Sequence, residues 1–287
     1  MSRSVIVGLD GSPESLAAAE WAAGEAGLLG LPLKLVQVWE PVPAPMAQAP
    51  LLGPETHQHW TDRIPRDAAR TVRERHPGIE VSTEQVTGNP ADALIKAASD
   101  AELLVLGSRG LGGLGGFLAG SVGLSVIAHA ERPVVSVKAV KDTPPATGPV
   151  VLGLDTDRPD RSLIDFAFEA AARRGGALRV MHAWNPPPYV AYGTPADPQL
   201  HETLLRADSE KLAEILRPWR HDFPGVRVAD QVRYGNPAVQ VVAAARDASL
   251  LVVGRRTRHN PLGTHIGHVT HAALHHCPAP VAVVPHD

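Results

Sequence analysis

A glycine-rich segment in the first half of the chain carries residue types that suit phosphate binding. It runs from Gly107 to Ser121, between a predicted strand at Leu103–Leu106 and a predicted helix from about Ser121. Backbone without Cβ atoms lets N–H groups converge on an anion, and the start of a helix adds a favourable dipole. Ser121 would supply both a helix cap and a hydroxyl donor. A flexible surface loop would explain the glycines but not this placement, so the segment predicts a phosphate cradle.

The cradle differs from the common phosphate motifs. No Gly-Lys-Ser or Gly-Lys-Thr occurs in the chain, which excludes a Walker A loop. The turn Gly8–Ser12 lacks the glycine spacing of a dinucleotide fingerprint. The segment also holds no lysine that could stabilise the charge developed in phosphoryl transfer. Because the chain shows neither a Ser–His–Asp arrangement nor a paired-carboxylate signature, we predict binding and no catalytic residue.

The elements that must position this segment occur twice along the chain. The repeats are separated by 145 to 147 residues, so the repeating unit is a whole domain. We predict a first domain at 1–142 with an intact nucleotide motif, a linker at 143–149 rich in proline, and a second domain at 150–287 with a degraded motif. The repeated segments are Val5–Asp10 with Val150–Asp155, Gly88-Asn89-Pro90 with Gly235-Asn236-Pro237, and Leu103–Gly107 with Leu250–Gly254.

Strands alternate with helices in both copies, which predicts an α/β fold of two tandem, doubly wound parallel sheets. Five strands are predicted in each copy, and the proline-rich stretch 41–54 is predicted to be irregular. The predicted strands are 4–9, 33–39, 80–86, 103–106 and 133–137, then 150–154, 178–184, 227–232, 250–253 and 281–284. The predicted first-half helices are 14–29, 60–75, one after Pro90 and one from about Ser121.

Composition narrows the class of protein. The chain has 287 residues, 44% of them hydrophobic, which is enough for two ordinary cores. A net charge of -3 gives no basic surface, so we expect neither nucleic acid nor an anionic membrane as a partner. The single cysteine, Cys277, excludes a disulfide framework. Without a leader before the first strand or a membrane-spanning run, we expect a soluble, cytoplasmic protein.

The spacing of the glycine-rich segment resembles that of a known family. Gly107, two residues, Gly110, nine residues and then Gly120-Ser121 is similar to the nucleotide-binding pattern of ATP-binding universal stress proteins. Asp10 stands where these proteins carry an acidic residue. The resemblance extends over both halves, including their Pro-Val-x-x-Val ends, so the chain resembles a tandem universal stress protein.

The resemblance implies a fold and a set of ligand contacts. The fold is similar to that of the adenine-nucleotide α-hydrolases, with strand order 3-2-1-4-5, which places the first and fourth strands at a switch point where ligands bind. Asp10 would lie near adenine and ribose, Val38 would contact adenine, and the glycine-rich segment would hold ribose and phosphates. Two simpler roles stay open, namely helix capping near Pro13 for Asp10 and solvation alone for Arg109. The implied binding residues are Gly8, Asp10, Val38, Gly107, Ser108, Arg109, Gly110, Leu111, Gly112, Gly113, Gly120, Ser121 and Val122, with Asp155 in the second domain.

The implied function is an ATP-binding stress-response protein that acts as a nucleotide-dependent sensor or regulatory module. ATP or another adenine nucleotide would be the ligand, with room for Mg²⁺, and turnover would be slow or absent. The final strands would mediate association, which makes a homodimer the expected assembly. Two alternatives stay open: an ATP-using enzyme of the adenine-nucleotide α-hydrolase group, and a structural interaction protein without nucleotide.

The second copy departs from the pattern at its own phosphate segment. Thr257 replaces the second glycine, and Gly267-His268 replaces Gly120-Ser121. A Cβ atom at Thr257 restricts positive φ, so we expect weaker, altered or absent nucleotide binding there. His268, His271 and His275 fall on one helix face with a spacing that a transition metal would accept. A polar or pH-sensitive face is the favoured interpretation, and no metal site is predicted.

Overall fold

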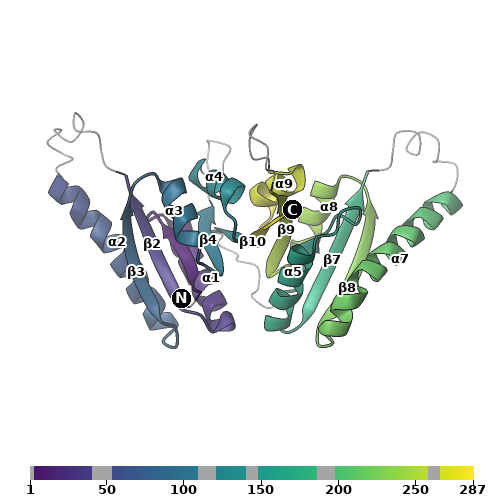
Figure 1. Cartoon of the computed structure of the whole chain (residues 1–287), viewed down its shortest axis with the longest axis horizontal. Coiled ribbons are helices and arrows are strands. Elements are labelled where there is room, and N and C mark those ends of the chain that lie inside the picture. The colour runs from purple at the N-terminus through teal and green to yellow at the C-terminus, as the bar shows by residue number, and fades with distance from the viewer. Residues whose placement is uncertain (1–2, 41–53, 109–120, 140–147, 186–197, 258–265) are drawn as a thin grey trace. The chain divides into compact units, whose positions relative to one another are not determined.

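The computed structural model describes residues 3–40, 54–108, 121–139, 148–185, 198–257 and 266–287. Contacts divide the chain into two compact units, Met1–Lys141 and Asp142–Asp287 (Figure 1). Most of the proposed linker at 143–149 lies outside the described residues and stays a prediction. Among the described residues, no helix is long and apolar enough to cross a membrane.

The first unit contains one parallel sheet. Its strands are β1 (Val5–Leu9), β2 (Leu33–Trp39), β3 (Val81–Thr87), β4 (Leu103–Ser108) and β5 (Val134–Lys138). They lie in the order β3-β2-β1-β4-β5, so the predicted order 3-2-1-4-5 is confirmed. β1 is central because Val5 pairs with Leu33 on one side and with Leu103 on the other.

Helices cover both faces of this sheet (Figure 1). They are α1 (Pro13–Leu29), α2 (Pro54–Arg75), α3 (Pro90–Ala98) and α4 (Ser121–His129). A Cβ atom on Gly8 would meet Leu94 of α3, whereas one on Gly107 would meet Glu14 of α1. Since side chains alternate across a strand, α1 and α3 lie on opposite faces, with α2 beside α1 and α4 beside α3.

The second unit repeats this topology. Its strands are β6 (Val150–Gly153), β7 (Ala177–Trp184), β8 (Arg227–Tyr234), β9 (Leu250–Arg256) and β10 (Val281–His286), in the order β8-β7-β6-β9-β10. Its helices are α5 (Arg161–Arg173), α7 (Pro198–Asp222), α8 (Pro237–Ala244) and α9 (His268–His276). Phe168 of α5 packs against Trp219 of α7 and against Phe223, the residue after α7, with ring centroids 6.4 and 5.6 Å away. These contacts join the two helices on one face.

The repeated Gly-Asn-Pro segments begin equivalent helices in the two units. The Asn89 Oδ1 accepts from the backbone N–H groups of Ala91 and Asp92 at the start of α3, and Asn236 does the same for α8. The preceding glycines have positive φ, 143° at Gly88 and 122° at Gly235. This repeat is therefore explained by helix capping and turn geometry.

Most predicted elements match the structure within a few residues, and one helix differs more. α2 begins at Pro54, whereas the sequence placed its start around Trp60 and assigned Pro54 to the irregular stretch. Proline is compatible with the first turn of a helix because the N–H group it lacks has no intrahelical acceptor there. The proline could therefore belong to either the loop or the helix.

Candidate functional site: two strand-end regions

The described part of the predicted nucleotide site lies at the carboxyl ends of three adjacent strands. Gly8 of β1 pairs with Leu106 of β4, and Asp10 follows β1 directly. Val38 is the penultimate residue of β2, which flanks β1 on its other side. The structure therefore brings Gly8, Asp10, Val38 and Gly107 to one edge of the sheet, at its topological switch point.

Asp10 organises the turn between β1 and α1. Its Oδ1 accepts from the backbone N of Ser12 at 2.9 Å and from the Ser12 hydroxyl at 2.5 Å. The Ser12 Oγ in turn accepts from the backbone N of Ser15 at 3.2 Å, so Ser12 is the N-cap of α1. Asp10 thus supports the cap without being the cap. The carboxylate remains exposed to solvent.

Gly107 has a packing role that sequence analysis did not reveal. A Cβ atom there would lie 2.5 Å from the backbone carbon of Glu14 and 2.6 Å from the nitrogen of Ser15. Only glycine allows the first turn of α1 to approach β4 this closely. The next residue, Ser108, is buried with 3% of its surface exposed.

The other predicted contact residues lie at the ends of the described ranges or outside them. α4 begins at Ser121, as predicted, and Val122 in its first turn is half-buried. Arg109, Gly110, Leu111, Gly112, Gly113 and Gly120 lie outside the described residues.

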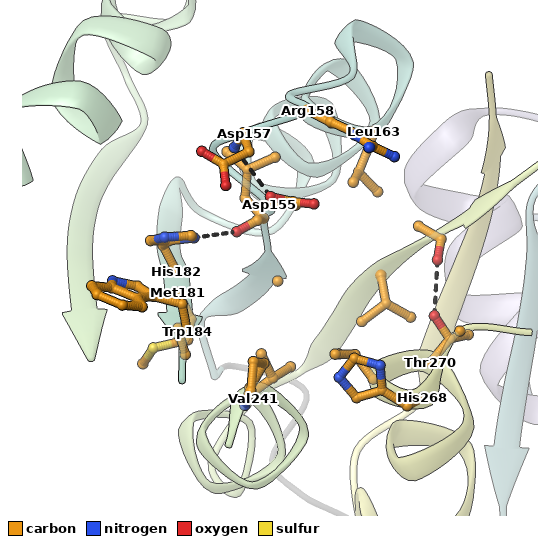
Figure 2. Close-up of a pocket in the computed structure, with 18 of the residues that line it drawn as sticks. Asp155, Asp157, Arg158, Leu163, Met181, His182, Trp184, Val241, His268 and Thr270 are labelled. Carbon is orange, nitrogen blue, oxygen red and sulfur yellow. Dashed lines mark hydrogen bonds between the residues drawn. The ribbon is translucent and has the colours of Figure 1, made fainter. Parts of the chain in front are cut away.

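In the second unit, a cavity of about 420 Å³ lies at the corresponding strand ends (Figure 2). The ends of β6, β7 and β9 and the helices α5, α8 and α9 contribute to its wall. Asp155 lines it together with Asp157, His182, Trp184 and Arg256, and the predicted ligand role of Asp155 stays a prediction. Sequence analysis did not predict the last four of these residues. An alignment of the two repeats makes Trp184 equivalent to Trp39, because each ends the second strand of its copy.

Asp155 occupies the position of Asp10 but has different partners. Its Oδ2 lies 3.2 Å from Nη2 of Arg256, the last residue of β9. Its Oδ1 accepts a hydrogen bond from the backbone N of Asp157 at 3.1 Å. The N-cap of α5 is Asp160, so the connection from Asp155 to the helix is longer than its counterpart after Asp10. The two domains therefore differ at the strand end that their sequences share.

His182 is buried at the end of β7, with 6% of its surface exposed. Its Nδ1 lies 3.0 Å from the carbonyl oxygen of Leu154, and its Nε2 lies 3.2 Å from the Thr156 hydroxyl. Because a carbonyl oxygen only accepts, Nδ1 carries a proton, and in the neutral ring Nε2 accepts from Thr156. The imidazole thus holds the segment Leu154–Thr156, which follows β6, against the end of β7.

Two further pairs of ionisable side chains interact in this unit. Asp157 lies 2.6 Å from Nζ of Lys211, and this hydrogen bond lowers the pKa of Asp157 below its usual value. On α9, the rings of His271 and His275 have centroids 4.3 Å apart. Within the part of the chain that the structure describes, no group of three metal-ligating side chains forms.

Two doubly wound parallel sheets, each with a candidate ligand site at its strand ends, make this chain a tandem α/β protein. The chain belongs to the universal stress protein family, whose model matches residues 1–138 and 147–285. A universal stress protein of Mycobacterium tuberculosis (strain ATCC 25618 / H37Rv) is 32% identical over 298 residues, covering 97% of this chain and 96% of the relative.

One solved structure shows the same architecture over the whole chain, and a second is similar to half of it. The crystal structure of a universal stress protein from Archaeoglobus fulgidus DSM 4304 has a TM-score of 0.74 at 18% identity, covering 99% of each chain. A universal stress protein solved in complex with cAMP covers 48% of this chain and 98% of its own, at 29% identity and a TM-score of 0.37.

Proposed function

We propose that the first domain binds an adenine nucleotide, with ATP as the leading candidate, and that the chain acts as a nucleotide-dependent sensor or regulatory module in a stress response. The observation that carries the proposal is the convergence of Gly8, Asp10, Val38 and Gly107 at the switch point of a doubly wound sheet. The Gly107–Ser121 spacing supports the nature of the ligand. The exposed carboxylate of Asp10 would accept hydrogen bonds from the ribose hydroxyls.

The proposed binding is accompanied by little or no hydrolysis. The glycine-rich segment carries no lysine, and the sequence contains neither a Ser–His–Asp arrangement nor a paired-carboxylate signature. Mg²⁺ would accompany the phosphates and be held mainly by them. We further propose a cytoplasmic homodimer, whose assembly state light scattering of the purified chain would measure.

Calorimetric titration with ATP, ADP and AMP tests the nucleotide proposal. Gly120→Val should abolish binding because a branched side chain would block the approach of phosphate to the backbone. Gly123→Val is the matched control, since a Cβ atom at Gly123 of α4 meets nothing within 4 Å. Equal ATP affinity in the parent and the Gly120→Val protein would disprove the cradle.

A turnover assay separates the sensor from an ATP-using enzyme. We expect a rate well below the median of about 10 per second typical of enzymes. A rate near that value that Gly120→Val abolishes would favour the enzyme. Mass analysis of small molecules released from protein purified without added nucleotide would identify the working ligand.

A further inference from the structure

Helix α2, which lies along the outside of the first unit in Figure 1, carries a line of arginine side chains on its solvent face. The arginines are spaced three, four and three residues apart, which places them on one face of the helix. All are exposed to solvent. At a rise of about 1.5 Å per residue, they extend over about 15 Å. We call this group the arginine stripe: Arg63, Arg66, Arg70 and Arg73.

Contacts within the domain hold part of the stripe in place. The two carboxylate oxygens of Asp67 lie 3.2 Å from Nε of Arg63 and 3.1 Å from Nη2 of Arg70. Nη2 of Arg73 donates to the carbonyl oxygen of Val81 in β3 at 2.7 Å. A guanidinium group has five N–H donors, so Arg70 and Arg73 keep donors for a ligand after these bonds. Because these side chains are already oriented, binding costs less side-chain entropy.

Two ordinary roles account for only part of the stripe. Basic side chains in the last turn of a helix complement its dipole, and Arg73 and Arg75 have that position in α2. Arg75 also lies 3.5 Å from a carboxylate oxygen of Glu20. Arg66 lies before that turn, and among the described side chains no acidic group pairs with it. Neither helix-dipole stabilisation nor ion pairing with the described residues therefore explains Arg66.

The equivalent helix of the second domain lacks this pattern. His76-Pro77-Gly78 after α2 corresponds to Phe223-Pro224-Gly225 after α7, so residues 63–75 correspond to residues 210–222. The first range holds five arginines and two acidic residues, a net charge of +3, whereas the second holds three basic and three acidic residues. The whole chain has a net charge of -3. The positive charge is therefore local to α2, and the fold that both copies share does not require it.

The composition of this face indicates the class of partner. A carboxylate can accept two N–H bonds from one guanidinium group, so a stripe of arginines suits an acidic ligand. Among the described residues, the large apolar side chains that are exposed lie on α1 and α8, so α2 offers no apolar face to a membrane. A polypeptide can place its carboxylates on either side of Asp67, whereas the closely and evenly spaced phosphates of a nucleic acid cannot avoid this negative charge.

We propose that the arginine stripe is a docking surface for an acidic segment of a partner protein. Carboxylates of that segment pair with Arg66 and with the remaining N–H groups of Arg70 and Arg73. Opposite charges on the two surfaces also speed their encounter. The stripe shares no residue with the nucleotide site proposed for the first domain, so the inference does not rest on nucleotide binding.

A matched pair of labelled peptides tests this surface on the full-length chain. Fluorescence anisotropy in about 0.1 M salt would compare a peptide of about ten glutamates, long enough to span the stripe, with a glutamine peptide of the same length. We expect the glutamate peptide to bind at least about tenfold more tightly, with an affinity that falls as salt is added. Equal affinities for the two peptides, or no measurable binding of either, would overturn the proposal.

Paired variants then locate the bound peptide. Arg66→Gln combined with Arg70→Gln should weaken binding of the glutamate peptide about tenfold, as expected for the loss of two exposed charge pairs. Asp67 keeps its other arginine in this protein, so α2 should stay folded, which circular dichroism would verify. Arg206→Gln combined with Arg217→Gln is the control, because it removes the same charge from exposed positions on α7. Equal losses in the two double variants would refute the assignment to the stripe.

Further measurements separate this ligand from other classes. Arg66→Lys combined with Arg70→Lys keeps the charge and should retain part of the affinity. Double-stranded DNA or anionic vesicles that bind more tightly than the glutamate peptide, and that lose this affinity in the glutamine double variant, would overturn the choice of an acidic protein. Gly120→Val should lose ATP and keep the peptide. Loss of the peptide in a folded Gly120→Val protein would place the peptide at the nucleotide site and defeat the inference.

Discussion

Two aspartates at equivalent positions show how neighbouring residues change the role of one side chain. Asp10 accepts from Ser12 and thereby supports the cap of α1. Asp155 pairs with Arg256 of β9 and leaves the capping of α5 to Asp160. A carboxylate that holds an arginine is less available to ribose hydroxyls than one that holds a serine. This contrast supports the inequality of the two domains that the sequence predicts.

At the residue scale, Asp10→Asn tests whether the carboxylate serves the ligand. The amide keeps an oxygen that can accept from Ser12, so the cap of α1 should survive. Removal of the charge should weaken ATP binding about tenfold, as expected for loss of one charge-assisted hydrogen bond. Calorimetry would measure the affinity. A change in thermal stability without a change in affinity would show that Asp10 is purely structural.

A second residue-scale prediction concerns the ion pair between Arg179 and Asp247. Nη1 and Nη2 of Arg179 lie 2.8 and 3.2 Å from the two carboxylate oxygens, and Nη1 also donates to the carbonyl oxygen of Ala244. Arg179→Met should lower the free energy of unfolding by about 1 kcal/mol, a modest value because Asp247 is mostly exposed. Urea unfolding at pH 7 would measure the loss. Arg217→Met should have a smaller effect, because the ion pair between Arg217 and Glu214 is more exposed to solvent.

The same ion pair gives a pH dependence of known sign. The hydrogen bond from Arg179 lowers the pKa of Asp247 below its usual value. A carboxyl group with a lowered pKa in the folded state contributes stability above its unfolded pKa and loses that contribution as pH falls through the folded value. The difference between the parent and Arg179→Met should therefore shrink below about pH 4. A difference that grows on acidification would contradict this linkage.

At the scale of elements, Gly107 determines how closely α1 approaches β4. Gly107→Ala should destabilise the chain by about 1–3 kcal/mol because the new methyl group would overlap the backbone of Glu14. Gly123→Ala, which adds a methyl group in open space, is the control. Thermal unfolding would compare the two. Equal stability would show that α1 can shift at no cost, and the packing explanation of this glycine would fail.

Helix capping gives another element-scale prediction. Asn89→Ala should cost about 1 kcal/mol because two N–H groups at the start of α3 lose their acceptor. Asn89→Asp should restore most of the stability, since a carboxylate oxygen accepts the same hydrogen bonds and favours the helix N-terminus. Chemical unfolding of the three proteins would provide the comparison. Similar losses in both variants would indicate that something other than the cap matters at Asn89.

The elements themselves were largely predictable because their signals are local. The strand at Leu33–Trp39 has the predicted bounds, and the strands at Val5–Leu9 and Leu103–Ser108 begin as buried apolar runs. The contacts that distinguish the sites were not predictable, because they join distant positions. The Asp155–Arg256 pair links residues 101 apart, and the clash that reserves Gly107 for glycine involves the start of another element. Such pairings become visible only once the strand order is known.

At the scale of the whole molecule, we expect a single tight ATP site per chain. The first domain keeps the glycine spacing of the phosphate segment. The second domain has Thr257 in place of the second glycine and His268 in place of the serine, and its Asp155 is paired with Arg256. Calorimetry on the full chain should give a stoichiometry near one, and Gly120→Val should abolish tight binding altogether. A second equivalent site that survives Gly120→Val would disprove the asymmetry.

The central position of β1 also has a consequence for synthesis on the ribosome. β1 pairs with β2 soon after both have been made, but its other neighbour is β4, which begins at Leu103. The first sheet therefore cannot close until most of its domain has left the exit tunnel, and such long-range pairing is slow. Until then the edge of β1 that will pair with β4 is unpaired, and its exposed backbone and apolar side chains can associate with other chains. Nascent first domains are thus most vulnerable to aggregation just before β4 emerges.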